Sequence, residues 1–245
     1  DALGSENVNS FFLPSTYTSP ESKKDAYQLA KKLEVDLKDI SIESIKKKIL
    51  NELSFLFEGL PQNITEENIQ SRIRGLILMA VSNKFNSLLI ATGNKSELAV
   101  GYSTLYGDMC GGFSLIKDIY KSQVVQLVKW RNEHLLDNFK IRETNVISNN
   151  IICKEPTAEL KPNQKDSDTL PNYDILDKIL EHIIDRRSDI SSIMKSGFSK
   201  RTIKKVWKMV KNSEYKRYQS AIGPKVSQMS FDKDRRFPLT NKFVI

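Results

Sequence analysis

The residues best suited to phosphate chemistry fall in the stretch ATGNKSELAVGY (residues 91–102), where a short apolar run ends. Thr92 and Gly93 would lie at the carboxyl end of a buried strand, which is where ligands bind in open α/β sheets. From Asn94 onward the sequence would open a helix, whose first turn offers free N–H groups and the positive end of a dipole to an anion. Glu97, in that turn, could hold Mg²⁺ against phosphate oxygens or could only complement the helix dipole, and the residues alone favour neither interpretation.

Further candidates lie in the glycine-rich segment that follows. Five of the ten glycines fall within residues 93–112, which concentrates backbone freedom in one place. Asp108 lies between glycines in this segment. Lys117 and Lys121 are four residues apart, so in a helix both ammonium groups would share a face and could meet a triphosphate. Two surface lysines at this spacing are common, so the spacing alone is a weak signal.

Three polar residues elsewhere could also meet an anionic ligand. Asn68 and Arg72 are four residues apart on the polar edge of an expected long helix, where they could offer an amide and a cation together. Thr157 directly follows a proline in a polar loop over residues 156–171, where its hydroxyl and the neighbouring amides could face a nucleotide. A solvated helix edge and a loop threonine without a ligand are the simpler interpretations, and the residues alone favour them.

The rare residue types exclude several classes of protein. The two cysteines, Cys110 and Cys153, give no disulfide framework and indicate a reducing, cytoplasmic setting. Because the only histidines are His134 and His182, both in helical patterns, we expect neither a structural zinc site nor a histidine-dependent nucleophile. The longest apolar runs are too short to span a bilayer, and the N-terminus carries no signal-peptide pattern.

The positive charge is confined to the C-terminal part of the chain. Residues 195–245 carry fourteen Lys/Arg against three Asp/Glu, a net charge of +11, whereas the first 194 residues carry −3. Such a block suggests an anionic partner, which could be nucleic acid, a membrane surface or a phosphate-bearing small molecule. A solvated helix face followed by a mobile tail is the plainer interpretation.

The elements that must position these residues alternate between strands and helices. We expect strands at residues 7–14, 37–42 and 87–93, and helices at residues 19–35, 43–57, 65–85, 121–136, 173–187 and 199–220. Ser19 marks one helix start and Thr65 another. The residues expected to form the core stripe of the helix at 65–85 are Ile69, Ile73, Leu76, Ile77 and Ala80. This order predicts an α/β fold with a parallel sheet and helices on both faces.

Five stretches of the chain carry a family resemblance. They are ENIQSRIRGLILMAVSNKF, TGNKSELAVGYSTLYGDMCGGFSLIKDIYK, KEPTAELKPNQKDSDTLPNYDILD, EYKRYQ and RRFPLTNKF. The resemblance covers almost the whole chain in order, and the TGNKSE…YGD block is its most specific part. The chain thus resembles the NAD⁺ synthetase family, and more narrowly the synthetase domain of its glutamine-dependent bacterial form.

The resemblance implies a fold and a reaction. The fold would be a Rossmann-like, doubly wound parallel sheet of the PP-loop ATP pyrophosphatase type (adenine nucleotide alpha hydrolase-like), with a helical, basic C-terminal region and residues 1–245 in a single domain. In the reaction, the nicotinate carboxylate of deamido-NAD⁺ attacks the α-phosphate of ATP, which gives an acyl-adenylate and pyrophosphate. Ammonia then displaces AMP to form NAD⁺. No protein nucleophile is required, so catalysis would rest on positioning and on cations set against phosphate charge.

The resemblance also implies roles for the residues at the ATP end. Thr92 would contact ATP, and Lys121 and Thr157 would approach its phosphates. Lys117 is a further ATP-binding candidate, from its spacing to Lys121 alone. The catalytic candidates are Lys121, Thr157 and Asp108.

The resemblance implies a second set of residues, which would bind the substrate deamido-NAD⁺. Asn68 would bind deamido-NAD⁺, and we extend that site to Arg72. Glu97 would serve both Mg²⁺ and deamido-NAD⁺. The family's C-terminal lysines also reach the dinucleotide, which indicates Lys216 first and Lys233 second.

Partners follow from the same resemblance. Synthetase domains of the family form a two-fold dimer with deamido-NAD⁺ at the interface, so we expect a homodimer, with no nucleic-acid or membrane partner. Ammonia would come from a nitrilase-like glutaminase domain upstream in the full-length protein, or from free ammonium. Ammonia-dependent relatives have an acidic residue where Gly112 stands, so their contacts at the nicotinate end are not carried over.

One part of the family pattern is absent from this sequence. The family holds pyrophosphate on a Ser-Gly-Gly-x-Asp-Ser loop after its first strand, where N–H groups form an anion nest, and no such stretch occurs here. The first residues, DALGSENV, resemble the end of the helix that follows this loop. We therefore expect a fragment that lacks the first strand and loop and has little or no synthetase activity on its own.

Two other functions compete with this one. The basic stretch SGFSKRTIKKVWKMVKNSEYKRYQS resembles a helix-turn-helix element of a nucleic-acid-binding module, but that function would leave TGNKSELAVGY unexplained. Another PP-loop adenylating amidotransferase, such as a GMP-synthetase-like enzyme, would keep the nucleotide site and differ in the substrate.

Overall fold

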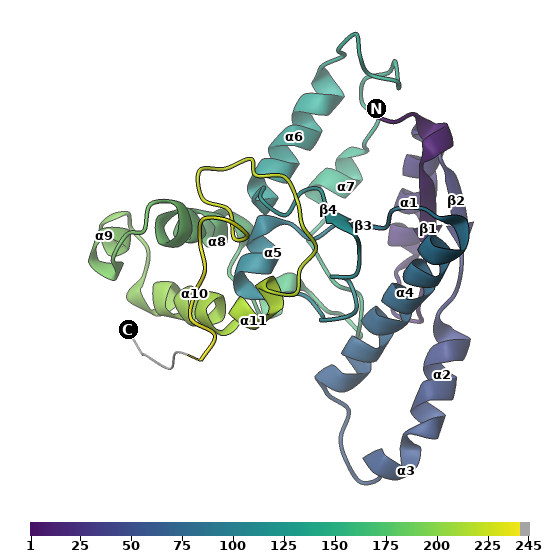
Figure 1. Ribbon diagram of the computed structural model, residues 1–245, viewed down its shortest axis with the longest axis horizontal. Helices are drawn as coiled ribbons and strands as arrows, with labels where there is room; N and C mark the ends of the chain where they lie inside the picture. Colours follow the sequence, from purple (N-terminus) through teal and green to yellow (C-terminus); the bar gives the residue numbers. More distant parts are fainter. Residues whose placement is uncertain (241–245) are drawn as a thin grey trace. The chain divides into compact units, whose positions relative to one another are not determined.

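The computed structural model describes residues 1–240, and the chain divides into two compact units (Figure 1). The first unit comprises Asp1–Ile73 and Val125–Asp168, and the second comprises Arg74–Val124 and Thr169–Ile245. Within the described residues, each unit holds one sheet of two parallel strands. The expected α/β fold with parallel strands is therefore confirmed.

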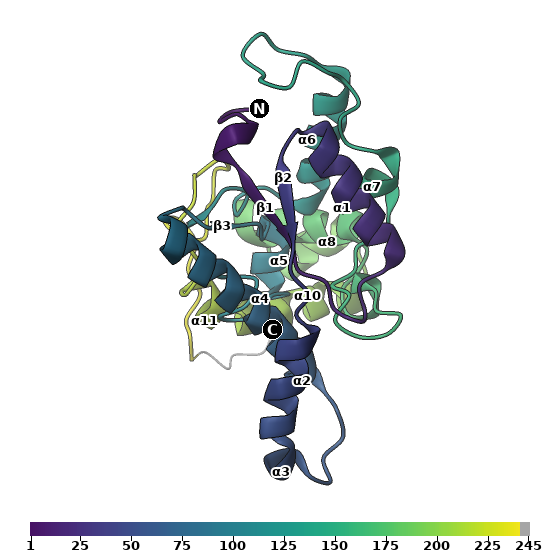
Figure 2. The same ribbon diagram turned by 90° about the vertical axis from the view of Figure 1, so that its right-hand side faces the viewer.

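The sheet of the first unit joins β1 (Asn9–Phe12) to β2 (Asp36–Asp39), which lie side by side in Figures 1 and 2. Helix α1 (Pro20–Lys32) connects the two strands and packs on both. Ser19 caps this helix by accepting a hydrogen bond from Ser22 N, and a proline occupies the first helical position, as the sequence predicts. Both strands are shorter than the expected runs.

The other elements of the first unit are helices or single helical turns. They are η1 (Ser5–Asn7), α2 (Glu43–Glu52), α3 (Ser54–Phe57), the first part of α4 (Ile64–Phe85), the later part of α6 (Lys121–Glu133), α7 (Asn149–Cys153) and η2 (Asp166–Asp168). The chain does not start with the end of an α-helix, because residues 1–4 are irregular and η1 is one 3₁₀ turn. Thr65 does not cap α4 either, because the helix begins before it, at Ile64. The side chain that meets the helix start is Asn63, whose Oδ1 accepts a hydrogen bond from Thr65 N at 2.8 Å.

The expected core stripe of α4 is buried only in part. Ile69 and Ile73 are 8% and 2% exposed, whereas Leu76 is 65% exposed. Ala80 is exposed as well. The boundary between the units falls after Ile73. Only the part of the stripe up to Ile73 is therefore buried in the core of the first unit. Periodicity identifies an apolar face but not the length over which that face is packed.

The second unit is built around a helical core beside a very short sheet. Its elements are the later part of α4, β3 (Ile90–Ala91), α5 (Lys95–Val100), β4 (Phe113–Ser114), the first turn of α6, α8 (Tyr173–Leu180), the π-helical turn η3 (Glu181–Asp185), α9 (Ile190–Lys195), α10 (Lys200–Asn212) and α11 (Glu214–Arg217). Helix α5 packs against α8, α10 and α11. The fully buried core side chains include Leu176, Ile179, Leu180, Ile183, Ile184, Ile203 and Val206. Each such side chain stabilises the folded state by about 1.5–3 kcal/mol relative to an exposed one.

A long coil ends the described chain. Residues 218–240 contain neither helix nor strand, and Figure 1 draws this segment in yellow around α5. The coil is bonded to α5 through Lys95, whose ammonium donates to Ser227 Oγ and Met229 O. It is therefore a packed part of the second unit.

Candidate functional site

A cavity of about 290 Å³ in the second unit gathers four of the predicted site residues. Thr92 follows β3, Glu97 lies in the first turn of α5, Asp108 lies in the loop between α5 and β4, and Lys121 begins α6. The other lining residues are Ala91, Gly93, Leu98, Ser103, Met109, Ser114, Ser220 and Ala221. The strand end and the glycine-rich segment thus meet in one place, where parallel sheets commonly bind ligands.

The corner between β3 and α5 is fixed by a capping box. Glu97 N donates to Asn94 Oδ1 at 3.0 Å, and Asn94 N donates to Glu97 Oε2 at 3.2 Å. The carboxylate of Glu97 therefore complements the helix start, which was one of its two interpretations. The expectation of free N–H groups in this turn is wrong for Glu97 N and for Lys95 N, which donates to Ile119 O at 2.9 Å. An anion in the cavity would be met mainly by side chains.

Lys121 is positioned by the backbone at the start of α6. Lys121 N donates to Ser96 Oγ at 2.9 Å, and the next amide, Ser122 N, donates to Asp177 Oδ2 at 2.8 Å. The Lys121 ammonium lies 5.8 Å from the centroid of the Tyr173 ring. Neither Ser96 nor Asp177 was singled out from the sequence, although Ser96 belongs to the TGNKSE block.

Asp108 and Lys216 influence each other electrostatically. Part of Asp108 is open to solvent, but its carboxylate is crowded by its own loop and accepts a hydrogen bond from Thr104 N at 2.6 Å. Burial raises the pKa of Asp108, although this hydrogen bond and the nearby charge of Lys216 both act to lower it. Burial lowers the pKa of Lys216, whose ammonium donates to Gly101 O and Ser103 O, both at 2.6 Å. Lys216 therefore supports the loop that lines the cavity.

A buried lysine that the sequence pattern did not reveal lies next to the corner. Lys95 is 0% exposed, and its ammonium lies 3.2 Å from Asp118 and 3.1 Å from Asp185. The same ammonium donates to Ser227 Oγ at 2.7 Å and to Met229 O at 2.9 Å. A buried ammonium requires such partners, because its desolvation is otherwise very unfavourable.

Lys117 does not share a helical face with Lys121. Helix α6 begins at Lys121, so Lys117 precedes it, and the condition for a paired lysine face is not met. Lys117 is 3% exposed, and its ammonium bonds to Ser220, Ala221 and Asp232. Its predicted contact with ATP gains no support from these surroundings.

Three predicted residues belong to the first unit. Asn68 is half-buried and Arg72 is exposed on α4, and Thr157 is half-buried in its loop. Thr157 Oγ1 donates to Gln164 O and accepts from Glu159 N at 3.2 Å. The hydroxyl thus closes its own loop. None of the three residues lines the cavity of the second unit.

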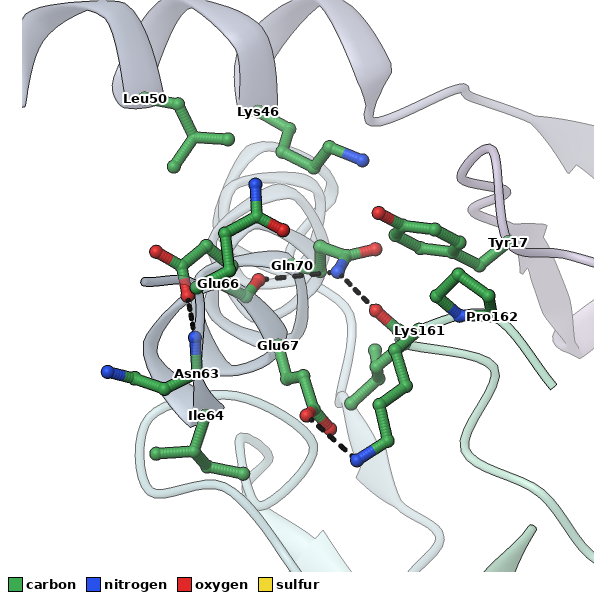
Figure 3. A pocket seen from close by; sticks show the side chains of 12 residues that line it. Tyr17, Lys46, Leu50, Asn63, Ile64, Glu66, Glu67, Gln70, Lys161 and Pro162 are labelled. Atoms are coloured by element: carbon green, nitrogen blue, oxygen red, sulfur yellow. Dashed lines mark hydrogen bonds and ion pairs between the residues drawn. The ribbon is translucent and has the colours of Figure 1, made fainter. Parts of the chain in front are cut away.

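A second cavity, of about 470 Å³, lies in the first unit between α2, the start of α4 and the loop after Thr157 (Figure 3). The loop is docked on α4, because Gln70 Nε2 donates to Leu160 O at 2.8 Å and Lys161 Nζ lies 3.3 Å from Glu67 Oε1. Gln70 is 1% exposed, and its Oε1 has no hydrogen-bond partner among the described residues. These contacts set the path of the loop that carries Thr157.

The remaining predicted residues lie outside both cavities. Lys233 is exposed on the C-terminal coil. His134 is exposed beside Trp130, and His182 is half-buried beside Ser188. Among residues 1–240, no group of three His, Cys, Asp or Glu side chains is placed to hold a metal ion. No helix in that part of the chain is long and apolar enough to cross a membrane.

Comparisons with known proteins give a consistent result. Residues 1–220 match the family described as NAD synthase. The chain is 47% identical to the glutamine-dependent NAD(+) synthetase of Thermotoga maritima, over 99% of this chain and 41% of that protein. It is 46% identical to the enzyme of that name from Acinetobacter baylyi, over 98% of this chain and 43% of that protein.

A solved structure gives the same match. The structure of glutamine-dependent NAD+ synthetase from Acinetobacter baumannii in complex with ADP superimposes with a TM-score of 0.59 at 41% identity. The match covers 98% of this chain and 42% of that one. The chain therefore spans about two fifths of the length of the relatives that it matches.

Proposed function

The chain belongs to the NAD synthase family, and from this premise we propose that it forms the ATP-dependent amidating part of a glutamine-dependent NAD⁺ synthetase. The proposed reaction amidates deamido-NAD⁺ to NAD⁺ through an adenylate and releases AMP and pyrophosphate. The observation that carries the proposal is the cavity in which Thr92, Glu97, Asp108 and Lys121 meet. Thr92, Glu97 and Asp108 belong to the most specific block of the family motif and Lys121 ends the same stretch, and the four converge at the carboxyl end of a parallel strand.

ATP is the nucleotide that we place in this cavity. Thr92 would contact it, and the Lys121 ammonium would oppose the negative charge of its phosphates. The relative from Acinetobacter baumannii was solved in complex with ADP, which supports an adenine nucleotide. Thr157, in the first unit, remains a candidate for the phosphates, and Asp108 and Lys121 remain candidates for the reacting end.

Mg²⁺ fits this cavity as an ion shared with the substrate. Mg²⁺ is usually held by one or two carboxylates together with substrate phosphates. Glu97 and Asp108 are the carboxylates that line the cavity. We assign the ion to Glu97, as the resemblance to the family implies. When bound, the ion would neutralise charge on the phosphate oxygens.

The remaining assignments are part of the same proposal. Asn68, Arg72, Lys216 and Lys233 would bind deamido-NAD⁺, and the functional form would be a cytoplasmic homodimer. Ammonia would come from a glutaminase region of a longer protein or from free ammonium. That the chain by itself has little or no activity stays a prediction.

Calorimetric titration with deamido-NAD⁺ and with XMP, each in the presence of ATP and Mg²⁺, tests this function. Micromolar binding of deamido-NAD⁺ without binding of XMP would support it. Binding of XMP alone would instead indicate a GMP-synthetase-like enzyme.

A nucleic-acid-binding role is the second candidate, because α10 exposes its basic side. One face of α10 is buried through Ile203, Val206 and Val210. The exposed basic residues of this helix are Lys200, Arg201, Lys204, Lys205 and Lys208. Fluorescence anisotropy with duplex DNA over a salt series tests this role. Sub-micromolar binding at physiological salt would favour it over the synthetase.

A further inference from the structure

One wall of the nucleotide cavity comes from the C-terminal coil. Ser220 and Ala221 line the cavity, and they begin a stretch of coil, residues 220–232, that we call the C-terminal strap. The strap has no helix or strand to hold it in place. Its position therefore depends on the contacts that it makes with the rest of the second unit.

Lys117 holds the strap at both of its ends. Its ammonium donates to Ala221 O, to Ser220 Oγ at 3.1 Å and to Asp232 Oδ1 at 2.8 Å. A lysine ammonium has three N–H donors, so these three acceptors use all of them. Lys117 can reach a phosphate only by giving up one of these bonds.

The neighbouring residue, Asp118, holds the middle of the strap. Its carboxylate accepts from Val226 N at 2.8 Å, from Ser227 N at 2.7 Å and from Ser227 Oγ at 2.8 Å. Burial works to raise the pKa of Asp118, but the bonds from Ser227 and Val226 and the charge of Lys95 outweigh it and hold the pKa below its ordinary value. The strap is thus bonded to two consecutive side chains.

The strap also runs very close to β4. Ser114 N donates to Ile222 O at 2.8 Å. A Cβ atom at Gly223 would clash with Ser114 O and with the side chain of Lys117. Because Ser114 itself lines the cavity, a displacement of the strap would change the cavity wall on both sides of this contact.

We propose that Lys117 is a positioning residue of the nucleotide site, which sets Ser220 and Ala221 as a wall against the bound nucleotide without contacting the nucleotide itself. This inference rests on the proposed binding of ATP in the cavity. It differs from the expectation, drawn from the spacing of Lys117 and Lys121, that Lys117 binds ATP directly, and the two make opposite predictions for the partner Asp232.

The test compares the ATP affinity of four variants and one control variant by calorimetry in the presence of Mg²⁺. Lys117→Met and Asp232→Asn should each weaken ATP binding by about tenfold, because each removes the charged contact between Lys117 and Asp232 that holds the strap. The double variant should bind ATP no more weakly than Lys117→Met does, because the two side chains act through one contact. Gly223→Ala, which displaces the strap without any change of charge, should also weaken binding. Lys208→Met, which removes an exposed lysine of α10 outside the strap and the cavity, is the control and should bind ATP as the wild type does.

Hydrogen exchange of the strap amides, measured without nucleotide, shows whether a variant has released the strap. Exchange at residues 221–227 should speed up in Lys117→Met, Asp232→Asn and Gly223→Ala while the amides of α8 and α10 stay protected. If Asp232→Asn kept or improved the ATP affinity while Lys117→Met lost it, Lys117 would contact ATP directly and the proposal would be overturned. If the wild type bound no ATP, the proposed function would fail and the wall would lose its role, whereas the exchange rates would still show whether Lys117 holds the strap.

Discussion

The Ser96 hydroxyl in the first turn of α5 donates a hydrogen bond to Asp177 Oδ1 on α8. The other oxygen of the same carboxylate, Asp177 Oδ2, accepts from Ser122 N in the first turn of α6 at 2.8 Å. Lys121 N closes the arrangement by donating to Ser96 Oγ at 2.9 Å. The first turn of α5 and the first turn of α6 are therefore fixed to each other. This relationship places the Lys121 side chain at the same cavity as Glu97.

The buried carboxylate of Asp177 should make stability depend on pH. Asp177 is 1% exposed, and burial raises its pKa above 3.8, against the hydrogen bonds from Ser96 and Ser122. The folded protein then holds this proton more tightly than the unfolded chain, so the contribution of Asp177 to stability falls as pH rises from 3.8 through the raised pKa. Urea unfolding of the wild type and Asp177→Asn at several pH values should show the wild type gaining stability over the variant as pH is lowered. A difference that stays constant with pH would contradict this account.

The two roles of Glu97 can be separated with two substitutions. Glutamine can replace glutamate in a capping box, so Glu97→Gln should keep the stability of the chain within about 0.5 kcal/mol, whereas Glu97→Ala should lose about 1 kcal/mol. Both variants lack the carboxylate, and both should lose the part of ATP affinity that depends on Mg²⁺. Urea unfolding and titrations with and without Mg²⁺ measure the two effects. Wild-type Mg²⁺ dependence in Glu97→Gln would refute the assigned metal role.

The charge of Lys216 should be measurable at Asp108. Burial raises the pKa of Asp108, and the positive charge of Lys216 partly opposes this rise. Lys216→Met should therefore raise the pKa of Asp108 further, as followed by NMR titration of its carboxylate carbon. Lys208→Met, at an exposed position of α10, is the matched control and should leave this pKa unchanged. An unchanged or lower pKa in Lys216→Met would show that the two groups are not coupled.

Helix starts could be predicted from the sequence where the signal is local. Ser19 and Asn94 each bond an amide three residues further along, so the pattern contains both partners. Thr65 was a wrong prediction because Asn63, only two residues earlier, accepts from the Thr65 amide itself. The four residues of the cavity could be named in advance because they belong to one motif, yet their convergence required the folded loop that carries Asp108.

The environment of the buried lysines could not be predicted. Lys95 and Lys117 look like surface charges in the sequence, because their carboxylate partners, Asp185 and Asp232, lie far along the chain. The same limitation applies to Leu76, whose apolar pattern predicts burial although the residue is 65% exposed. In each case tertiary contacts, and not the local pattern, decide which side chains are buried.

The ATP affinity of Lys121→Ala tests the central claim most directly. The position is held in the fold by its backbone amide, so the variant should remain folded while it loses the cation at the cavity. Calorimetric titration with ATP and Mg²⁺ should show binding to the wild type and a Kd about 10- to 100-fold higher for Lys121→Ala, since a bond to a charged group contributes about 1.5–3 kcal/mol. Lys129→Ala, at an exposed position of the same helix, should bind as the wild type does. Equal affinity of the wild type and Lys121→Ala would contradict the assignment of this cavity to ATP.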